Sequence, residues 1–234
     1  MSKPTNSQLP QSANIVSRWL LTEASGNRSD SVGSNTLTDN NTVAAGAGLD
    51  GEWANSADFE AGNSEYLSIT DASQTGLDPA GAFSISAWVK LESVGVNHCI
   101  MAKVIGSGGP GTSYYRFIVE STDKFFLDVW NGSSSAGSTS AATLTTGVWY
   151  HLVCVYSPST RMTTYLNGVV TNNNTTSIPS ALPNNTYDVN IGRYQTGSYF
   201  DGLLQDVVFW NVALTDAEVA NLYSKYSSSF FNMF

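Results

Sequence analysis

Charged residues are scarce in this chain of 234 residues, and their scarcity argues against several classes of protein. Only 12% of the residues are charged, and 19 acidic against 10 basic residues give a formal net charge of −9. The chain contains no run of Lys or Arg of the kind that follows nucleic-acid phosphates or anionic lipid headgroups. It also contains no stretch of about 18 consecutive apolar residues, so we expect no membrane-spanning helix.

Cysteine is equally rare. Cys99 and Cys154 are the only two, and each lies within an apolar, strand-like run. Two isolated cysteines without histidines at ligand spacing do not form a zinc pattern. We expect buried free thiols, with a disulfide between neighbouring strands as the open alternative. Residues 1–10 have no apolar stretch, so we also expect no cleaved secretion signal.

Ser, Thr and Asn, together with 20 Gly, take the place of the missing charges. This composition is typical of short strands joined by many turns. The chain is 41% hydrophobic and 12% aromatic, which is enough for a core. Its length suits one all-β domain.

Alternation of apolar and polar residues is the dominant pattern. In residues 83–90, for example, Phe83, Ile85, Ala87 and Val89 share one face, and Trp88 on the other face suggests that this face is covered as well. The strands expected from this pattern span 83–90, 115–120, 124–130, 149–156, 161–166, 188–192 and 202–210.

Two local signals define a turn and a helix. Asn167-Gly168 is a preferred two-residue hairpin turn, because both residue types tolerate positive φ. Thr215 and Glu218 have the spacing of a capping box, and apolar residues follow at helical spacing, which predicts one short C-terminal helix.

Several segments together resemble the laminin-G-like, concanavalin A-like lectin/glucanase family. They follow the family's order over about residues 15–226, and they span 19–26, 30–33, 37–43, 57–60, 65–69, 83–88, 149–151, 165–168, 191–193, 201–202 and 205–214. The resemblance implies an all-β jelly roll of two antiparallel sheets with one short C-terminal helix. It also implies a mostly non-catalytic role in recognising glycans or proteins. We therefore expect an N-terminal arm at 1–14, the sandwich at 15–226 and an aromatic tail at 227–234.

The resemblance implies a possible calcium site near a sandwich edge. Asp30 and Asn35 match the family's early loop, and Asp206 matches the second position of its late acidic pair. Hard oxygen ligands of this kind suit Ca²⁺. Gln205 stands where relatives often have Asp, and this loss of charge weakens or abolishes the predicted site. The alternative is that these residues only form turns.

Catalysis is not expected. Glucanases with this fold carry Glu-x-Asp-x-x-Glu on one strand, and no Glu of this chain has that spacing. His151, beside Trp149 in the most apolar strand, matches a structural strand position of the family, and His98 gives no stronger signal.

Glycan binding requires an aromatic platform with amide or carboxylate neighbours. The candidates are Trp130 with Asn131, and Tyr194 with Tyr199, while the alternative for each is packing. Phe230, Phe231 and Phe234 of the tail suit burial against a neighbouring subunit.

These observations favour a non-enzymatic recognition or structural module that assembles with other subunits. We expect a virion component, either a capsid decoration or a receptor-binding protein, on the surface of a virus particle. The alternatives are an exported or cell-surface lectin and, less favoured, a glycoside hydrolase. The expected partners are a glycan or a surface protein, without nucleic acid and without membrane insertion.

Overall fold

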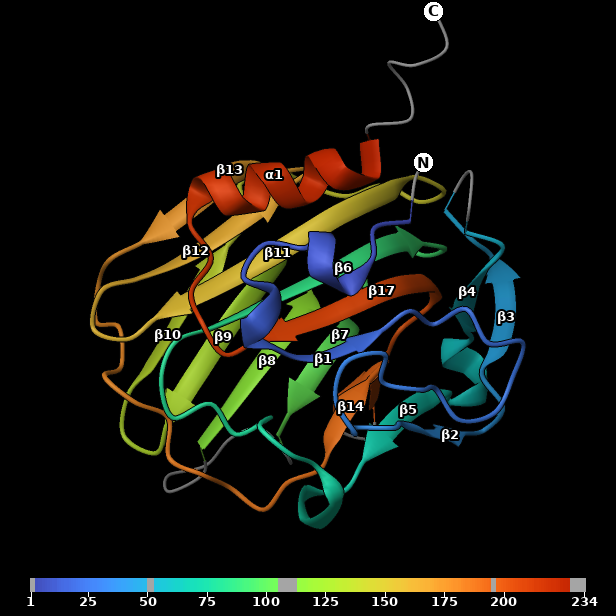
Figure 1. Cartoon of the computed structure of the whole chain (residues 1–234), viewed down its shortest axis with the longest axis horizontal. Coiled ribbons are helices and arrows are strands. Elements are labelled where there is room, and N and C mark those ends of the chain that lie inside the picture. Colours follow the sequence, from blue (N-terminus) through green and yellow to red (C-terminus); the bar gives the residue numbers. More distant parts are fainter. Residues whose placement is uncertain (1–2, 50–52, 105–112, 195–196, 228–234) are drawn as a thin grey trace, which may run out of the picture.

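The computed structural model describes residues 3–49, 53–104, 113–194 and 197–227, and these form a sandwich of two antiparallel sheets (Figure 1). We call the sheet nearer the viewer in Figure 1 the front sheet. Its strand order is β13-β12-β11-β6-β17-β4-β3, and β1 also pairs with β17. The bounds of its strands are β1 Ile15–Trp19, β3 Ala44–Ala47, β4 Asn55–Phe59, β6 Phe83–Leu91, β11 Trp149–Ser157, β12 Arg161–Leu166, β13 Val169–Asn174 and β17 Gly202–Trp210.

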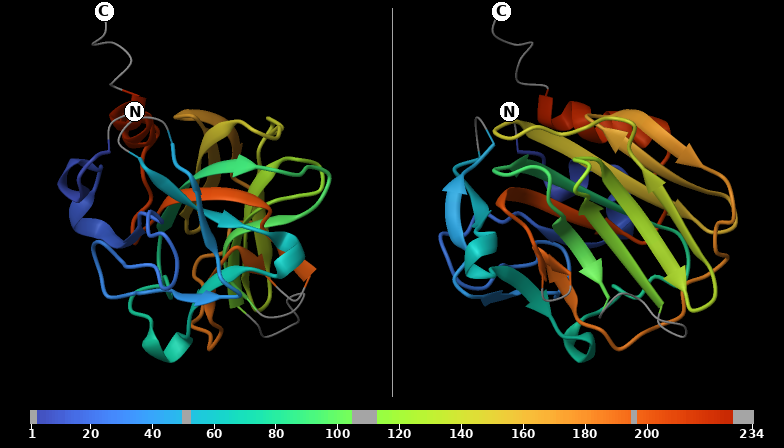
Figure 2. Two further views of the ribbon diagram at one scale, coloured as in Figure 1. Left: turned by 90° about the vertical axis from the view of Figure 1, so that its right-hand side faces the viewer. Right: turned by 180° about the vertical axis from the view of Figure 1, so that it is seen from behind.

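The back sheet has the order β10-β9-β8-β7-β14-β5-β2 and faces the viewer in the right-hand view of Figure 2. Its strands are β2 Thr38–Asn40, β5 Tyr66–Ile69, β7 His98–Lys103, β8 Ser113–Val119, β9 Phe125–Asn131, β10 Ser135–Thr139 and β14 Val189–Ile191. A two-stranded ribbon follows, made of β15 Arg193–Tyr194 and β16 Ser198–Tyr199. The helical elements are η1 Asn6–Gln8, η2 Ser12–Asn14, η3 Ala61–Asn63, η4 Asp71–Ser73 and α1 Asp216–Ser227.

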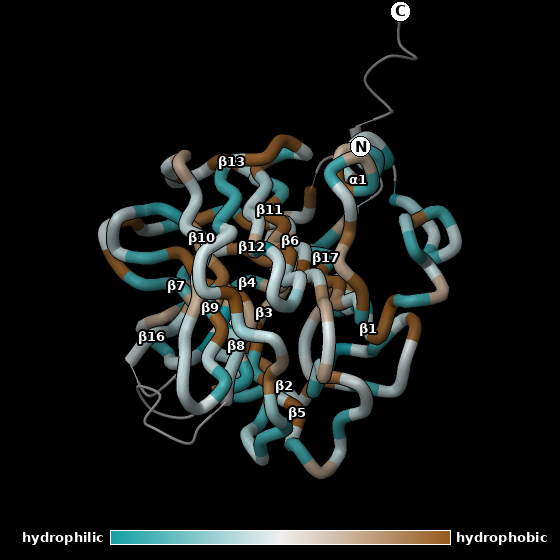
Figure 3. Tube along the Cα trace, turned by 90° about the vertical axis from the view of Figure 1, so that its left-hand side faces the viewer, coloured by the Kyte–Doolittle hydropathy of each residue, from teal (hydrophilic) through white to brown (hydrophobic). Residues whose placement is uncertain are grey.

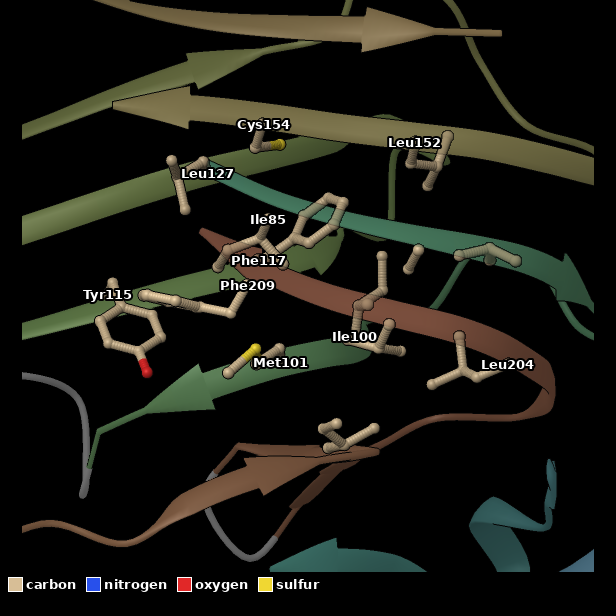
Figure 4. Close-up of a cluster of buried hydrophobic side chains, with 14 of the residues drawn as sticks. Ile85, Ile100, Met101, Tyr115, Phe117, Leu127, Leu152, Cys154, Leu204 and Phe209 are labelled. Carbon is tan, nitrogen blue, oxygen red and sulfur yellow. The ribbon is translucent and has the colours of Figure 1, made fainter. Parts of the chain in front are cut away.

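The main core lies between the sheets (Figure 4). Alternate residues of facing strands fill it, because successive side chains of a strand point to opposite faces. Ile85 and Phe209 of the front sheet pack in one cluster with Phe117 and Leu127 of the back sheet. Hydrophobic and hydrophilic residues accordingly alternate along several strands in Figure 3.

A second apolar cluster covers the outer face of the front sheet. Trp88 and Val153 of that sheet pack against Leu222 and Tyr226 of α1, and Leu9 of the N-terminal arm joins the same cluster. Trp210 donates from its indole N–H to the carbonyl of Pro10 at 3.0 Å, which ties the arm to the sheet. The helix therefore covers a sheet face, which explains why Trp88 points away from the main core.

The local signals in the sequence are confirmed. Asn167 and Gly168 have φ of 50° and 81° and join β12 to β13. Thr215 Oγ1 accepts from the Glu218 amide, while Glu218 accepts from the Thr215 amide, so the capping box starts α1. Each strand predicted by alternation is present, with bounds that differ by at most two residues. Among the described helices, none is long and apolar enough to cross a bilayer.

A buried ion pair ties together the arm, β1, β17 and α1. Arg18 of β1 donates from Nε and Nη2 to the two carboxylate oxygens of Asp206 at 2.7 and 2.9 Å. Its Nη1 donates to the Pro4 carbonyl and to Asn6 Oδ1, at 2.9 and 2.8 Å. The hydroxyl of Tyr226 also donates to Asp206. Arg18 and Asp206 are both 1% exposed.

Asp206 lies at an irregularity in β17. Its φ is 50°, and the register of β17 against β6 shifts between Gln205 and Val208. Before this point β17 pairs with β4, and after it β17 pairs with β1. A bulge redirects a strand in this way and turns one side chain toward a new neighbour.

Both cysteines are buried free thiols, as expected. Cys154 lies in the core between the sheets, whereas Cys99 belongs to a cluster on the outer face of the back sheet. The alternative of a disulfide is therefore wrong.

Asp206→Asn should strongly destabilise the fold, because it leaves the buried guanidinium of Arg18 without its counter-ion. The expected loss in free energy of unfolding is about 3–5 kcal/mol. Urea denaturation followed by tryptophan fluorescence measures it. The control is Arg161→Met, which removes the exposed Arg161–Asp216 pair and should cost at most about 1 kcal/mol. Equal losses in the two variants would contradict this assignment.

Candidate functional site

The outer face of the back sheet carries a pocket beside strand β14. The pocket has a volume of about 180 Å³ and is lined by Val104, Thr186, Tyr187, Asp188, Asn190 and Arg193. Val189 and Ile191 of β14 point into the core, so Asn190 between them points outward. The pocket is smaller than the roughly 300–1,000 Å³ typical of drug-sized ligands. Its size suits one small polar ring.

A buried lysine anchors the wall of this pocket. Lys103, at the end of β7, is fully buried and pairs with the carboxylates of Asp71 and Asp78 at 2.5 and 2.9 Å. Its Nζ also donates to the Asn185 carbonyl at 3.2 Å, just before the wall residues 186–188. The hydrogen bond from Lys103 lowers the pKa of Asp71. The amide of Asp71 in turn donates to Asp188 Oδ1 at 3.2 Å.

Arg193 at the start of β15 forms another side of the pocket. Its guanidinium carbon lies 3.6 Å from the centre of the Tyr66 ring, and its Nη2 donates to Asn190 Oδ1 at 3.1 Å. Gly192 precedes it with φ of +87°, and a Cβ there would lie 2.6 Å from the Phe59 ring. Only glycine therefore fits this bend, which sets where Arg193 begins.

An aromatic cluster adjoins the pocket on the same face. The guanidinium of Arg116 lies 5.5, 5.6 and 5.2 Å from the ring centres of Tyr114, Phe126 and Tyr194. Arg116 Nε donates to Asp128 at 2.6 Å. Burial raises the pKa of Asp128, and burial with the nearby Asp128 raises the pKa of Tyr114 to about 12. Val104 belongs both to this cluster and to the pocket lining.

The structure brings together three of the four predicted glycan-binding residues on this face. Trp130 packs against the aromatic cluster and Tyr194 is part of it. Tyr199 pairs with Arg193 across the ribbon, and its ring lies 6.4 Å from that of Tyr66. Asn131 instead holds a turn, because its Oδ1 accepts from the amides of Ser133 and Ser134 at 3.0 and 2.8 Å. Glycan contact by these four residues stays a prediction.

Sequence reasoning did not single out the pocket-lining residues Asp188, Asn190 and Arg193. Segment 191–193 contributed only to the family resemblance. The signal that was present is the polar alternation in 188–193, which places Asp188 and Asn190 two residues apart on an outward face.

The predicted calcium ligands lie around β1, and their polar atoms are engaged by protein groups. Asp30 Oδ1 accepts from the amides of Arg18, Val32 and Gly33, each at 3.0 Å. Asn35 donates to Ser17 Oγ at 2.7 Å and accepts from the Thr75 amide. The carboxylate of Asp206 forms an ion pair with the guanidinium of Arg18. These contacts favour the turn-forming alternative for Asp30, and calcium at the three residues stays a prediction.

Asp58 and Glu60, two residues apart in sequence, meet the more distant Glu92 at one end of the front sheet. Oxygen atoms of Asp58, Glu60 and Glu92 lie within 4.8 Å of one another. Desolvation and repulsion from nearby carboxylates raise the pKa of each, and for Asp58 the repelling groups are Glu65 and Asp201. Glu60 and Glu92 are exposed. Asp58 lies on β4, Glu60 directly follows β4 and Glu92 directly follows β6, so no local sequence motif predicts this group.

His151 is fully buried beneath α1. Its ring lies 5.0 Å from Trp88 and 5.4 Å from Tyr226, and neither ring nitrogen has a hydrogen-bond partner among the described residues. Burial lowers its pKa to about 3. Because substrate does not reach a residue enclosed in this way, His151 is a packing residue, as the family position implied. The predicted assembly residues Phe230, Phe231 and Phe234 lie outside the described residues.

The sequence profile described as the concanavalin A-like lectin/glucanases superfamily matches residues 61–220, which is more than half of the chain. The chain therefore belongs to this superfamily. A search of curated proteins found no match.

Solved structures with the same fold have low sequence identity. Domain 4 of AbnA, an extracellular arabinanase from Geobacillus stearothermophilus solved with arabinotriose, is 19% identical with a TM-score of 0.69 over 90% of this chain and 98% of that one. The binding domain of Paraclostridial Mosquitocidal Protein 1 is 12% identical with a TM-score of 0.73, covering 92% of this chain and 52% of that one. The binding domain of botulinum neurotoxin DC, solved with SialylT, is 11% identical with a TM-score of 0.63, covering 91% and 51%. This chain spans about half the length of the two toxin chains.

His151 should make the fold sensitive to acid. Its pKa is about 3 in the folded state against 6.5 for a free histidine, so the unfolded state binds the proton more readily. The stabilisation from a neutral His151 is complete above about pH 6.5 and is lost as the pH falls toward 3. His151→Phe should therefore gain stability relative to the native protein by about 1.4 kcal/mol for each pH unit in that window.

Urea denaturation of both proteins at several pH values measures this difference. Comparing the two proteins cancels the contributions of His98 and of the carboxylates, which both share. A stability difference that stays constant between pH 7 and 4 would contradict the assignment.

Proposed function

We propose that this protein is a non-catalytic glycan-binding module that holds one sugar residue in the pocket beside β14. The observation that carries the proposal is the lining of that pocket, which places Tyr187, Asp188, Asn190 and Arg193 together on the outer face of a lectin-type sheet.

Each of these groups matches one part of a sugar. The aromatic ring of Tyr187 offers an apolar face for the C–H face of a pyranose or furanose. The carboxylate of Asp188 accepts hydrogen bonds from hydroxyls, and the guanidinium of Arg193 donates them. Asn190 is 5% exposed and orients Arg193 through its Oδ1. A few convergent polar groups in a small concave site are what specific small-ligand binding requires.

The comparisons support binding in a general sense. The superfamily contains lectins, the arabinanase domain was solved with arabinotriose and the neurotoxin domain with SialylT. The position of those ligands is a property of those proteins, so the pocket assignment rests on the residues of this chain.

Catalysis is not part of the proposal. Glycoside hydrolysis commonly uses two carboxyl groups that flank the scissile bond, and Asp188 is the only carboxylate in the pocket lining. A second candidate function, hydrolysis at Asp58, Glu60 and Glu92, is favoured by the spacing and the pKa values of these carboxylates. Their oxygens lie within 4.8 Å of one another, near the spacing of retaining enzymes, and their pKa values are raised.

The setting of the module is a further part of the proposal. We expect it on the surface of a virus particle, where a glycan-binding subunit would contact the host, with an exported or cell-surface lectin as the alternative. Purified particles probed with an antibody against this chain test the setting. Absence from particles together with presence in culture medium would favour the alternative.

Tyr187→Ala and Asp188→Ala should each weaken binding of the best glycan on an array by about tenfold or more, because each removes one direct contact of about 1.5 kcal/mol. Isothermal titration measures the loss. Thr160→Ala, in the turn between β11 and β12 of the front sheet, is the matched control and should bind as the native protein does. Full affinity in both pocket variants would place the site elsewhere.

The protein should release no reducing sugar from β-glucans, arabinans or sialosides. The same assay on Glu60→Gln and Glu92→Gln serves as a control, since turnover that both substitutions abolish would establish the hydrolase instead. Turnover that survives both would point to carboxylates outside this cluster.

A further inference from the structure

We propose that the bound sugar carries a carboxylate and that Arg193 is the residue that recognises it. This inference rests on the glycan-binding function proposed above and names the chemical class of its ligand.

Within the part of the chain that the structure describes, Arg193 lacks an acidic partner, unlike three of the other four arginines. Arg18, Arg116 and Arg161 each pair with an aspartate. Arg28 is fully buried and donates to the carbonyls of Gly26 and Val43. Among the described residues, no carboxylate lies within ion-pair distance of Arg193, and its one hydrogen bond between described side chains goes to the neutral amide of Asn190. In a chain with a net charge of −9, an arginine left without an acidic partner in a pocket points to an anion from outside.

The guanidinium of Arg193 is held in place before any ligand arrives. The ring of Tyr66 supports one face of the guanidinium at 3.6 Å, and Asn190 Oδ1 accepts from Nη2. The backbone on either side is fixed by the bend at Gly192 and by pairing of Arg193 with Tyr199. A donor fork fixed in this way loses little side-chain entropy on binding, so more of the interaction appears as affinity.

The shape and charge of the pocket favour a carboxylate over other anions. A planar carboxylate matches the planar fork with two parallel N–H···O bonds. Asp188 lies in the same lining and repels negative charge, which disfavours a doubly charged phosphate more than a singly charged acid. The same Asp188 accepts hydrogen bonds from sugar hydroxyls. In this arrangement Arg193 binds the carboxylate of the sugar and Asp188 binds its hydroxyls.

The test compares sugars that differ only in the acid group. Isothermal titration of the full chain uses digalacturonic acid against its methyl ester, and sialyllactose against lactose. The native protein should bind at least one acid about tenfold or more tightly than its neutral partner, which is the usual size of a hydrogen-bonded charge contact. Raising the salt concentration should weaken binding of the acid and leave the neutral sugar unchanged.

Arg193→Gln should remove this preference, and Arg193→Lys should lose most of it because a lysine keeps the charge and lacks the fork. Circular dichroism checks that each variant is folded, and the lysine variant carries the test if the glutamine variant is not. Arg161→Gln is the matched control, since it removes one positive charge from the front sheet, and it should keep the full preference.

Neutral sugars bound as tightly as the acids, or a preference that survives Arg193→Gln, would overturn this inference and leave the proposed glycan-binding function intact. Binding of a sulfated disaccharide in place of either carboxylated sugar would overturn the carboxylate assignment. Failure of both acidic and neutral sugars to bind would overturn the proposed function itself.

Discussion

The contact between Arg18 and Asp206 is the constraint on which the arrangement of the front sheet depends. A guanidinium and a carboxylate that are each 1% exposed must satisfy one another, because an isolated buried charge is very costly. The ion pair fixes the bulge at Asp206 in β17 and holds β1 beside that strand. The hydrogen bond from Arg18 to the Pro4 carbonyl positions the N-terminal arm, and the one from Tyr226 to Asp206 positions the end of α1. The partners are 188 residues apart in sequence, so the pair closes the fold between its two ends.

The two outer faces of the sandwich have different surroundings, and this difference supports placing the proposed glycan site on the back sheet. On the front sheet, Trp88 and His151 are enclosed by α1 and the arm, and the result is a second core. On the back sheet, the outward side chains are polar groups and aromatics arranged around two arginines. Arg116 is neutralised by Asp128, so that part of the face is a rigid aromatic support, while the part next to β14 keeps its hydrogen-bonding capacity.

Local rules predicted much of the fold and little of the site. Alternation located the long strands, and the pairs Asn167-Gly168 and Thr215/Glu218 fixed a turn and a helix start, since each signal is complete within a few residues. Strands such as β2 and β5 are too short to show a clear alternation, and they lie within segments that contributed to the family resemblance. The acidic group of Asp58, Glu60 and Glu92 and the ion pair of Asp206 depend on which strands become neighbours. The same holds for the pocket, where Val104 of one segment meets Arg193 of another.

The position of β17 in the front sheet has a consequence for biosynthesis. This strand comprises residues 202–210 and pairs with β1, β4 and β6, which lie far earlier in the chain. Most of the polypeptide must therefore be synthesised before β17 can take its place in the sheet. Until then the edges of β1, β4 and β6 that pair with β17 stay unpaired. Long-range pairing of this kind makes folding slow and gives aggregation-prone intermediates. The short edge strand β2 consists only of the polar residues Thr38, Asp39 and Asn40, which suits a chain that spends time in that state.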